Sequence, residues 1–306
     1  MPGCPALLTP AHAERIETRL RSARDDELAE LLWKLRRRRK VAVQPRAALQ
    51  QARELELVES SPDTPLRLTP LGAKVSDSLI EYAYWKQRGR RHHWSEEVPA
   101  LRVESLRGKR ILEVGSGAGV NLLSLQRCAE VVGLDLEPLY LQFTEILARL
   151  EGVPTPTRVC GVAERLPFQD ESFDVALFHG SLPYMRIQHA LCETARVLRP
   201  GGSAIAIQSD LWQTLGIRVR QRGWNLLSPG VFLREARAAA GMLAYPWMGR
   251  VLLEPFAPVH VTGQQMRRWL AQAGLRVNAR ETCRVSHEVC CVAQKPAAGR
   301  DVRVQE

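Results

Sequence analysis

The chain has 306 residues, of which 45% are hydrophobic, and a formal net charge of +10. This length predicts about two domains, and the apolar fraction suffices for a core without disulfide or metal staples. The seven cysteines form no CxxC pair and no metal-like spacing with histidine, and no apolar run approaches the roughly 18 residues of a membrane span. These features argue against a disulfide scaffold, a metal site and a transmembrane protein, and predict a cytoplasmic location.

The first part of the chain predicts a small, mainly helical unit. Residues 25–35 repeat leucine at the i, i+3, i+4, i+7 spacing of a helix with one buried face, and a second helical stretch covers 45–56. Short strands at 57–59 and 66–68 flank a turn-rich loop, and a further helix reaches about Trp85. This order resembles a winged-helix module, which in enzymes serves dimerisation or covers an active site and in regulators binds DNA.

Two basic clusters lie in or beside this first unit, at Arg36–Lys40 and Lys86–His93. Cations suit the C-terminal end of a helix dipole, so both clusters are consistent with solvated helix ends. A basic surface also suits nucleic acid, and this interpretation stays open. We predict that the helical domain covers 1–94.

The stretch from Ile111 to Gly119 predicts a cradle for a nucleotide cofactor. A short apolar run containing Glu113 leads into a loop with glycine at 115, 117 and 119, and a helical pattern follows. Glycine allows a sharp turn and a close approach to a ligand with no Cβ in the way. The helix start behind the loop offers N–H groups to a carboxylate or phosphate.

A second apolar run, 131–134, ends in Asp135, which predicts an acid placed to bind ribose hydroxyls. A dinucleotide-dependent oxidoreductase is one alternative for such a strand pair. The spacing of the glycine loop argues against it, because Gly119 comes one residue earlier than the last glycine of the dinucleotide fingerprint.

Strands and helices alternate through the rest of the chain, which predicts a parallel sheet with helices on both faces and ligands at the carboxyl ends of the strands. His179 and Tyr184 follow the fourth of these strands and are the candidates for contact with a substrate. Imidazole exchanges a proton near neutral pH, so His179 can serve as a general base. The alternative is that His179 packs against the cofactor or caps a helix.

A long insertion at 211–259 is rich in large apolar side chains and predicts either a lid over an apolar substrate pocket or a packing surface for the sheet or a partner subunit. A helix at 262–273 and two strands near 275–281 and 286–293 close the catalytic domain. We predict that this domain covers 95–296 and that 297–306 form a flexible tail.

Four blocks in this order resemble class I S-adenosylmethionine-dependent methyltransferases, and in particular the small-molecule branch of ubiquinone and menaquinone biosynthesis. The blocks are 111–119, 131–138, 162–176 and 196–202, and the resemblance covers roughly 95–295. It implies an α/β fold with a Rossmann-like, mostly parallel seven-stranded sheet. It also implies S-adenosyl-L-methionine as cofactor and methyl transfer to a small-molecule acceptor, with a homodimer as one arrangement. A DNA-binding regulator that senses the same cofactor is the alternative.

The resemblance also implies which residues bind the cofactor, with His179 and Tyr184 as catalytic candidates. The family usually has Asp where this chain has Val162, so adenine would be held by backbone groups and apolar walls. The Asn-Pro-Pro-Tyr motif of amino-methylating nucleic-acid enzymes does not follow the fourth strand, which argues against methylation of a base amino group but not against every RNA substrate. The predicted cofactor residues are Glu113, Gly115, Ser116, Gly117, Gly119, Asp135, Leu136, Val162, Ala163, Glu164 and Phe178.

Overall fold

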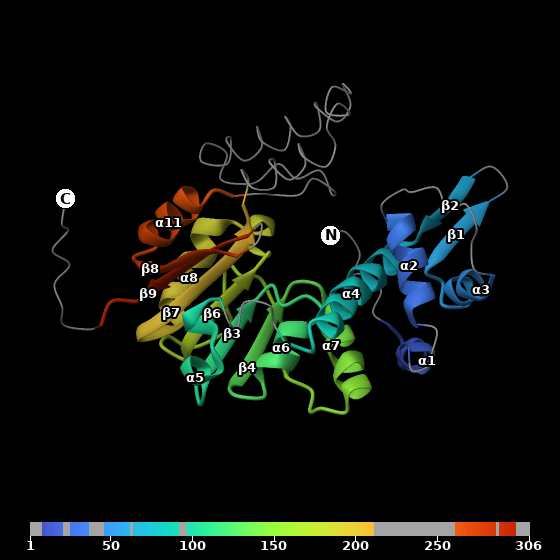
Figure 1. The fold of residues 1–306 in the computed structure, drawn as a ribbon, viewed down its shortest axis with the longest axis horizontal. Helices are drawn as coiled ribbons and strands as arrows, with labels where there is room; N and C mark the ends of the chain where they lie inside the picture. The colour runs from blue at the N-terminus through green and yellow to red at the C-terminus, as the bar shows by residue number, and fades with distance from the viewer. Residues whose placement is uncertain are drawn as a thin grey trace, which may run out of the picture. The chain divides into compact units, whose positions relative to one another are not determined.

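The computed structural model describes most of the chain as two compact units (Figure 1). Unit 1 joins Met1–His92 with Ser116–Arg127 and Glu137–Cys160. Unit 2 joins the remaining three segments, His93–Gly115, Cys128–Leu136 and Gly161–Glu306. The described residues are 8–20, 25–36, 46–61, 64–91, 97–210, 261–285 and 288–297.

Unit 1 is mainly helical and contains one small antiparallel hairpin, in which Val58 pairs with Leu68. The hairpin and the helices around it follow the order expected from the sequence, and the winged-helix assignment stays a prediction. The elements of unit 1 are α1 (Pro10–Leu20), α2 (Asp25–Arg36), α3 (Arg46–Glu54), β1 (Val58–Ser61), β2 (Thr64–Leu68), α4 (Pro70–Gln87), α6 (Val120–Leu125), α7 (Pro138–Glu151) and β5 (Thr157–Cys160).

Helix α1 was not expected, although the chain carries a signal for its start. A Thr-Pro pair opens both α1 and α4, and in each case the threonine hydroxyl accepts a backbone N–H of the first turn. Thr9 accepts from His12 at 3.1 Å, and Thr69 accepts from Gly72 at 3.0 Å. Proline suits the first helical position because its fixed φ matches the helix and its missing N–H is not needed there.

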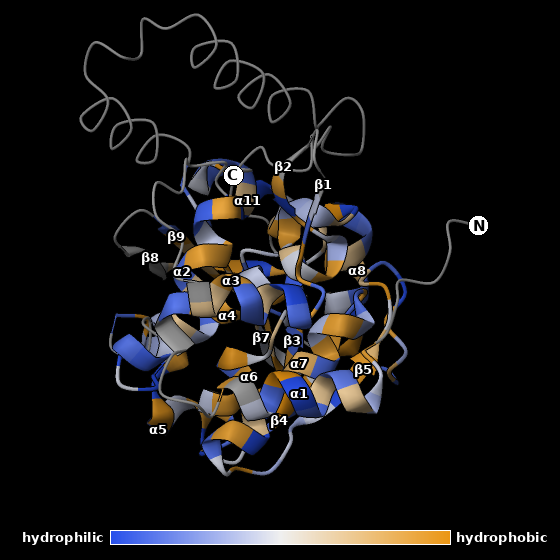
Figure 2. Ribbon diagram, turned by 90° about the vertical axis from the view of Figure 1, so that its right-hand side faces the viewer, coloured by the Kyte–Doolittle hydropathy of each residue, from blue (hydrophilic) through white to orange (hydrophobic). Residues whose placement is uncertain are grey.

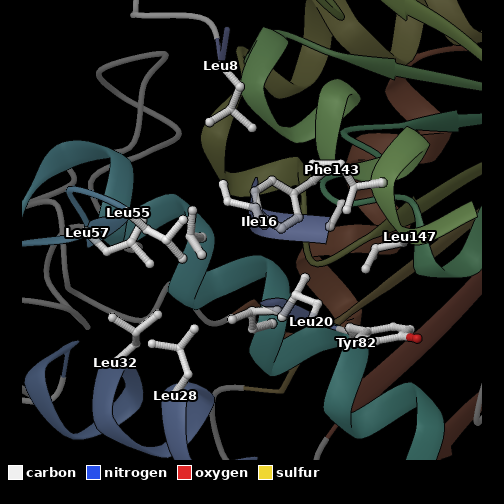
Figure 3. Close-up of a cluster of buried hydrophobic side chains, with 14 of the residues drawn as sticks. Leu8, Ile16, Leu20, Leu28, Leu32, Leu55, Leu57, Tyr82, Phe143 and Leu147 are labelled. Carbon is white, nitrogen blue, oxygen red and sulfur yellow. The ribbon is translucent and has the colours of Figure 1, made fainter. Parts of the chain in front are cut away.

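One hydrophobic core runs through unit 1 and joins its two ends in sequence (Figure 3). Ile16 and Leu32, from α1 and α2, belong to the same buried cluster as Phe143 and Leu147 from α7. Figure 2 colours these helices in alternating orange and blue, as expected for helices with one buried face. The N-terminal helices therefore bury their apolar faces together with helices of the segment that was predicted to bind the cofactor.

Unit 2 is built on strands that carry nearly continuous apolar runs. Helices α8 and α11 pack against each other and lie beside strands β7, β8 and β9 (Figure 1). The elements of unit 2 are η1 (Pro99–Leu101), α5 (Val103–Leu106), β3 (Arg110–Val114), β4 (Glu130–Asp135), β6 (Phe173–His179), η2 (Leu182–Tyr184), α8 (Ile187–Val197), β7 (Leu198–Ser209), α11 (Gly263–Gln272), β8 (Arg276–Val285) and β9 (Glu288–Gln294).

The strands form a seven-stranded sheet in the order β5-β4-β3-β6-β7-β9-β8. Strand β3 pairs in parallel with β4 and β6, and β6 pairs in parallel with β7. Strand β9 is antiparallel to both β7 and β8, which places the C-terminal hairpin at the sheet edge. The predicted Rossmann-like, mostly parallel sheet of seven strands is confirmed.

Several predictions concern residues that the structure does not describe. The insertion at 211–259, Arg37–Lys40 of the first basic cluster and nearly all of the tail lie outside the described residues. The boundary predicted at residue 94 stays a prediction. No helix in the described part of the chain is both long enough and apolar enough to cross a membrane.

Candidate functional site

The glycine loop, residues 115–119, follows β3 and begins with a glycine that no other residue can replace without cost. Gly115 has a φ of +75°, and its N–H donates to the Leu134 carbonyl of β4 at 2.7 Å. A Cβ added to Gly115 would lie 2.4 Å from the Cβ of Ser181, which follows β6. The Ser181 hydroxyl donates to the Val114 carbonyl at 2.6 Å, so it cannot move away freely. Both φ and space require glycine here.

The last position of the glycine loop also requires glycine. Gly119 has a φ of +77°, and a Cβ added to it would lie 2.5 Å from side-chain atoms of Thr144 on α7. Between these ends, Ser116 is 6% exposed, and its hydroxyl has no hydrogen-bond partner among the residues that the structure describes. A buried hydroxyl of this kind ordinarily finds a partner, and a polar ligand group can supply one.

The carboxyl ends of β3 and β4 carry the two predicted acids. Glu113 is 1% exposed next to the last residue of β3, and Asp135 is half-buried as the last residue of β4. The Asp135 carbonyl accepts the Gly161 N–H at 3.0 Å, which holds the segments after β4 and after β5 side by side. Leu136 and Val162 follow in these two segments, and both side chains are exposed, at 69% and 41%.

Several exposed apolar side chains of unit 2 stand at predicted ligand-binding positions. Five large hydrophobic side chains are exposed among the described residues, and three of them stand at positions predicted to bind a cofactor or substrate. Most of the large apolar side chains elsewhere in the unit are buried, so an exposed one at such a position can offer a contact to an apolar ligand group. The three are Leu136, Val162 and Tyr184.

Arg196 holds the loop that follows Val162. Its guanidinium donates to the carbonyls of Leu166 and Phe168 at 3.0 and 2.8 Å, and it pairs with Glu193 at 2.8 Å. Asp170 is a second carboxylate partner, at 2.7 Å. The hydrogen bond from Arg196 lowers the pKa of the Glu193 carboxyl, although burial alone would raise it. The same pairing raises the pKa of Arg196.

The Arg196→Met variant is therefore expected to unfold at lower urea concentration, with a loss of about 1.5–3 kcal/mol, the range for hydrogen bonds to charged groups. Arg268→Met, in an exposed position on α11, is the matched control and should be neutral. Because the pKa of Glu193 is lowered in the folded state, the pair stabilises above the ordinary carboxyl pKa and this contribution disappears as pH falls through the folded value. The gap between wild type and variant should therefore narrow at low pH to the part that comes from the hydrogen bonds to the Leu166 and Phe168 carbonyls, and a gap of constant size would contradict the contribution of the ion pair.

Three other predicted cofactor residues differ from these in how far their side chains are buried. Glu164 is half-buried and its carboxylate accepts the Arg186 N–H at 2.6 Å, which ties the loop after β5 to the segment after η2. Ala163 is 6% exposed, and Phe178 is fully buried within β6. The Phe178 side chain therefore belongs to the core, and only its backbone is left for a ligand.

His179, the last residue of β6, has an acidic neighbour that sequence reasoning missed. Its Nε2 lies 3.6 Å from Oε1 of Glu288, with side-chain exposures of 30% and 11%. Glu288 opens β9 and pairs with Ser209 of β7, while His179 pairs with Ile207 of the same strand. This adjacency depends on hairpin register, which no local pattern around residue 288 reports. Tyr184, in η2, is 72% exposed.

A second residue missed from the sequence lies in unit 1, on helix α4. The carboxylate of Glu81 is 3.4 Å from the position that a Cβ on Gly117 would take. One turn further along α4, the Trp85 indole N–H donates to the Ser124 hydroxyl of α6 at 2.5 Å. The end of α4 thus packs on the helix that follows the glycine loop and brings an acid to the loop itself.

Comparison with known proteins gives matches to the segment that carries most of these residues. Residues 112–206 match the family model described as a methyltransferase domain. A phthiotriol/phenolphthiotriol dimycocerosates methyltransferase of Mycobacterium leprae is 42% identical over 102 residues, which are 32% of this chain and 37% of that protein. A fatty-acid O-methyltransferase of Mycolicibacterium smegmatis is 41% identical over 99 residues, 31% of this chain and 35% of that protein.

Among solved structures, a SAM-dependent methyltransferase from Aquifex aeolicus is similar with a TM-score of 0.46 and 14% identity, covering 68% of this chain and 95% of that one. The fold assignment rests instead on the strand order of the sheet. The chain matches little more than a third of the length of the curated relatives. These matches show that residues 112–206 of the chain are similar to methyltransferase domains.

Proposed function

We propose that the chain transfers a methyl group from S-adenosyl-L-methionine to a small-molecule acceptor. The observation that carries this proposal is that the strand ends of unit 2 carry a buried acid, Glu113, and a half-buried one, Asp135, and that two exposed apolar side chains, Leu136 and Val162, follow in adjoining segments. An acid beside an apolar surface suits a nucleoside, whose ribose offers hydroxyls and whose base offers flat apolar faces. The match to a methyltransferase domain supports this choice over a dinucleotide.

The residues present fit the cofactor. Gly115 and Gly119 leave no side chain in the loop after β3, and the Ser116 hydroxyl is buried without a partner in the described part of the chain. Asp135 would bind the ribose hydroxyls. Val162 would pack against adenine as an apolar wall, in place of the acid usual in the family, which makes the exposure of this valine side chain understandable.

When bound, the cofactor supplies a methyl group on a sulfonium, which already has a good leaving group. The chain's part is then to orient the acceptor, exclude water and remove a proton. His179 is placed to accept that proton, and the Glu288 carboxylate at 3.6 Å stabilises the resulting imidazolium. Tyr184 lies exposed in the η2 segment that follows and would contact the acceptor.

We propose an oxygen of an apolar molecule as the acceptor atom. One relative is named a fatty-acid O-methyltransferase, and the others are named for dimycocerosate substrates. A base beside the site suits a hydroxyl, which must lose a proton on methylation. The apolar insertion at 211–259 would enclose such an acceptor, and as it lies outside the described residues this enclosure stays a prediction.

The N-terminal helices are proposed to support and cover the active site, with or without a second copy of the chain, rather than to read DNA. Their apolar side chains share one core with α6 and α7 (Figure 3). Arg36, the described member of the first basic cluster, is used internally and pairs with Asp77 of α4 at 2.8 Å. A winged-helix regulator would present that cluster to phosphates and show steep salt dependence of duplex binding.

The test is calorimetry with S-adenosylhomocysteine on the Asp135→Ala variant. Loss of charge-assisted hydrogen bonds to ribose, each worth about 1.5–3 kcal/mol, should weaken binding at least about tenfold with the urea midpoint unchanged. Glu130→Ala is the matched control, because Glu130 is exposed at the opposite end of the same strand. Equal affinity of the Asp135 variant and wild type would refute the proposed site.

A further inference from the structure

Helix α4 is fixed on the segment that carries the glycine loop by two hydrogen bonds from its last turns. The Trp85 indole donates to Ser124 of α6, and the Tyr82 hydroxyl donates to Glu151 of α7, each at 2.5 Å. Both rings are buried, at 4% and 7% exposure, and they stack with centroids 6.0 Å apart. The last turns of α4 therefore have a defined position relative to α6 and α7.

Glu81 shares the face of α4 that carries Trp85, since residues four apart lie one above the other on a helix. Its side chain is exposed, yet its carboxylate oxygens lie 3.4 and 3.6 Å from the point where Gly117 would carry a Cβ. A negative charge from a distant part of the sequence thus stands directly against the middle of the glycine loop. A side chain at Gly117 would occupy the space in front of this carboxylate.

The proposed cofactor is asymmetric in charge. Its adenosine end is neutral, and its amino-acid end carries an ammonium group beside the sulfonium. Gly117, which belongs to the same unit as Glu81, leaves the backbone of the glycine loop open to a close approach, so the amino-acid end would lie there. We infer that Glu81 binds the ammonium group of the cofactor's amino-acid end, which makes helix α4 a contributor to cofactor binding. This inference rests on the proposed function.

The chemistry favours this ligand group over others. A carboxylate gains most from a cationic hydrogen-bond donor, and such bonds are short and stronger than neutral ones. The carboxylate of Glu81 would repel a phosphate, so it also disfavours the phosphorylated cofactors that other glycine loops accept. The N-terminal helices would then do more than support the fold, because removing them would remove a binding group.

The experiment compares two ligands on two variants by calorimetry. S-adenosylhomocysteine carries the amino-acid end, and 5′-methylthioadenosine has the same adenosine and sulfur without it. Glu81→Gln keeps the shape and removes the charge, and Glu14→Gln, in an exposed position on α1, removes the same charge elsewhere in unit 1. We expect Glu81→Gln to weaken S-adenosylhomocysteine about tenfold or more and to change methylthioadenosine binding by less than about twofold.

The outcomes separate this inference from the proposed function. If wild type binds neither ligand, the proposed function fails and the inference with it. If wild type binds both and Glu81→Gln binds S-adenosylhomocysteine as well as wild type does, the role of Glu81 is refuted and the function stands. An equal loss for both ligands also refutes it, because the effect would then concern adenosine or the fold. The inference is supported if Glu14→Gln also binds S-adenosylhomocysteine as wild type does and if both variants have the urea midpoint of wild type.

Discussion

The His179→Gln variant is expected to lose roughly 10²–10⁴-fold in kcat while binding S-adenosylhomocysteine as wild type does, because a positioned general base contributes that much to a proton transfer. Glutamine keeps much of the size and polarity of the ring and cannot accept a proton at neutral pH. The measurement is the formation of S-adenosylhomocysteine with a long-chain alcohol that wild type methylates, because a fatty acid is already ionised at neutral pH and needs no base. His189→Gln, in an exposed position on α8, is the control and should keep full activity.

Glu288 distinguishes a base from a histidine that only packs. Its carboxylate lies 3.6 Å from His179 and favours the protonated ring, so Glu288→Gln should move the acid limb of kcat against pH to lower pH. A histidine with a structural role would lower kcat at every pH and leave the profile in place. If the His179→Gln enzyme is as active as wild type, His179 is not a general base, and the chain contributes to catalysis only by positioning the acceptor.

The sequence correctly predicted the positions of candidate functional residues that stand at the end of a buried strand. Buried strands read as continuous apolar runs, so the ends of β3, β4 and β6 could be located, and with them Glu113, Asp135 and His179. Because parallel strands end at one edge of a sheet, the sequence alone assigns these residues to one edge. The two closing strands predicted near 275–281 and 286–293 correspond to β8 and β9.

The contacts that sequence reasoning missed are those that join distant segments. Glu288 meets His179 only because β9 inserts between β7 and β8, and the register of that pairing is set by the whole hairpin. Glu81 reaches Gly117 only because α4 packs on α6. Helix α1 was missed because its buried face offers little more than Ile16 and Leu20, too few large apolar residues for a periodic pattern.

For the N-terminal helices, the sequence predicts which residues are buried but not what they pack against. The amphipathic spacing in 25–35 correctly predicted that Leu28, Leu31 and Leu32 are buried. It could not identify what covers them, because periodicity identifies a buried face and not its partner. In the structure their cluster includes Phe143 of α7, more than a hundred residues along the chain.

The Gly115→Ala variant is expected to lose about 2–5 kcal/mol of unfolding free energy. A left-handed backbone costs a non-glycine residue about 1–2 kcal/mol, and overpacking adds about 1–3 kcal/mol where the new Cβ would lie 2.4 Å from the Cβ of Ser181. Gly201→Ala is the matched control, since Gly201 has a φ of +80° and nothing within 4 Å of an added Cβ. It should lose only the backbone contribution, as measured by urea unfolding.

A double-mutant cycle assigns the difference between these two variants to the contact itself. Ser181→Gly removes the obstructing Cβ, although alone it also removes the hydrogen bond to the Val114 carbonyl at 2.6 Å. If the clash is the cause, Gly115→Ala should cost less in the Ser181→Gly background than in wild type, with a coupling of about 1–3 kcal/mol. Additive effects would mean that the backbone at Gly115 accounts for the whole loss, and Gly115→Ala would then be no worse than Gly201→Ala.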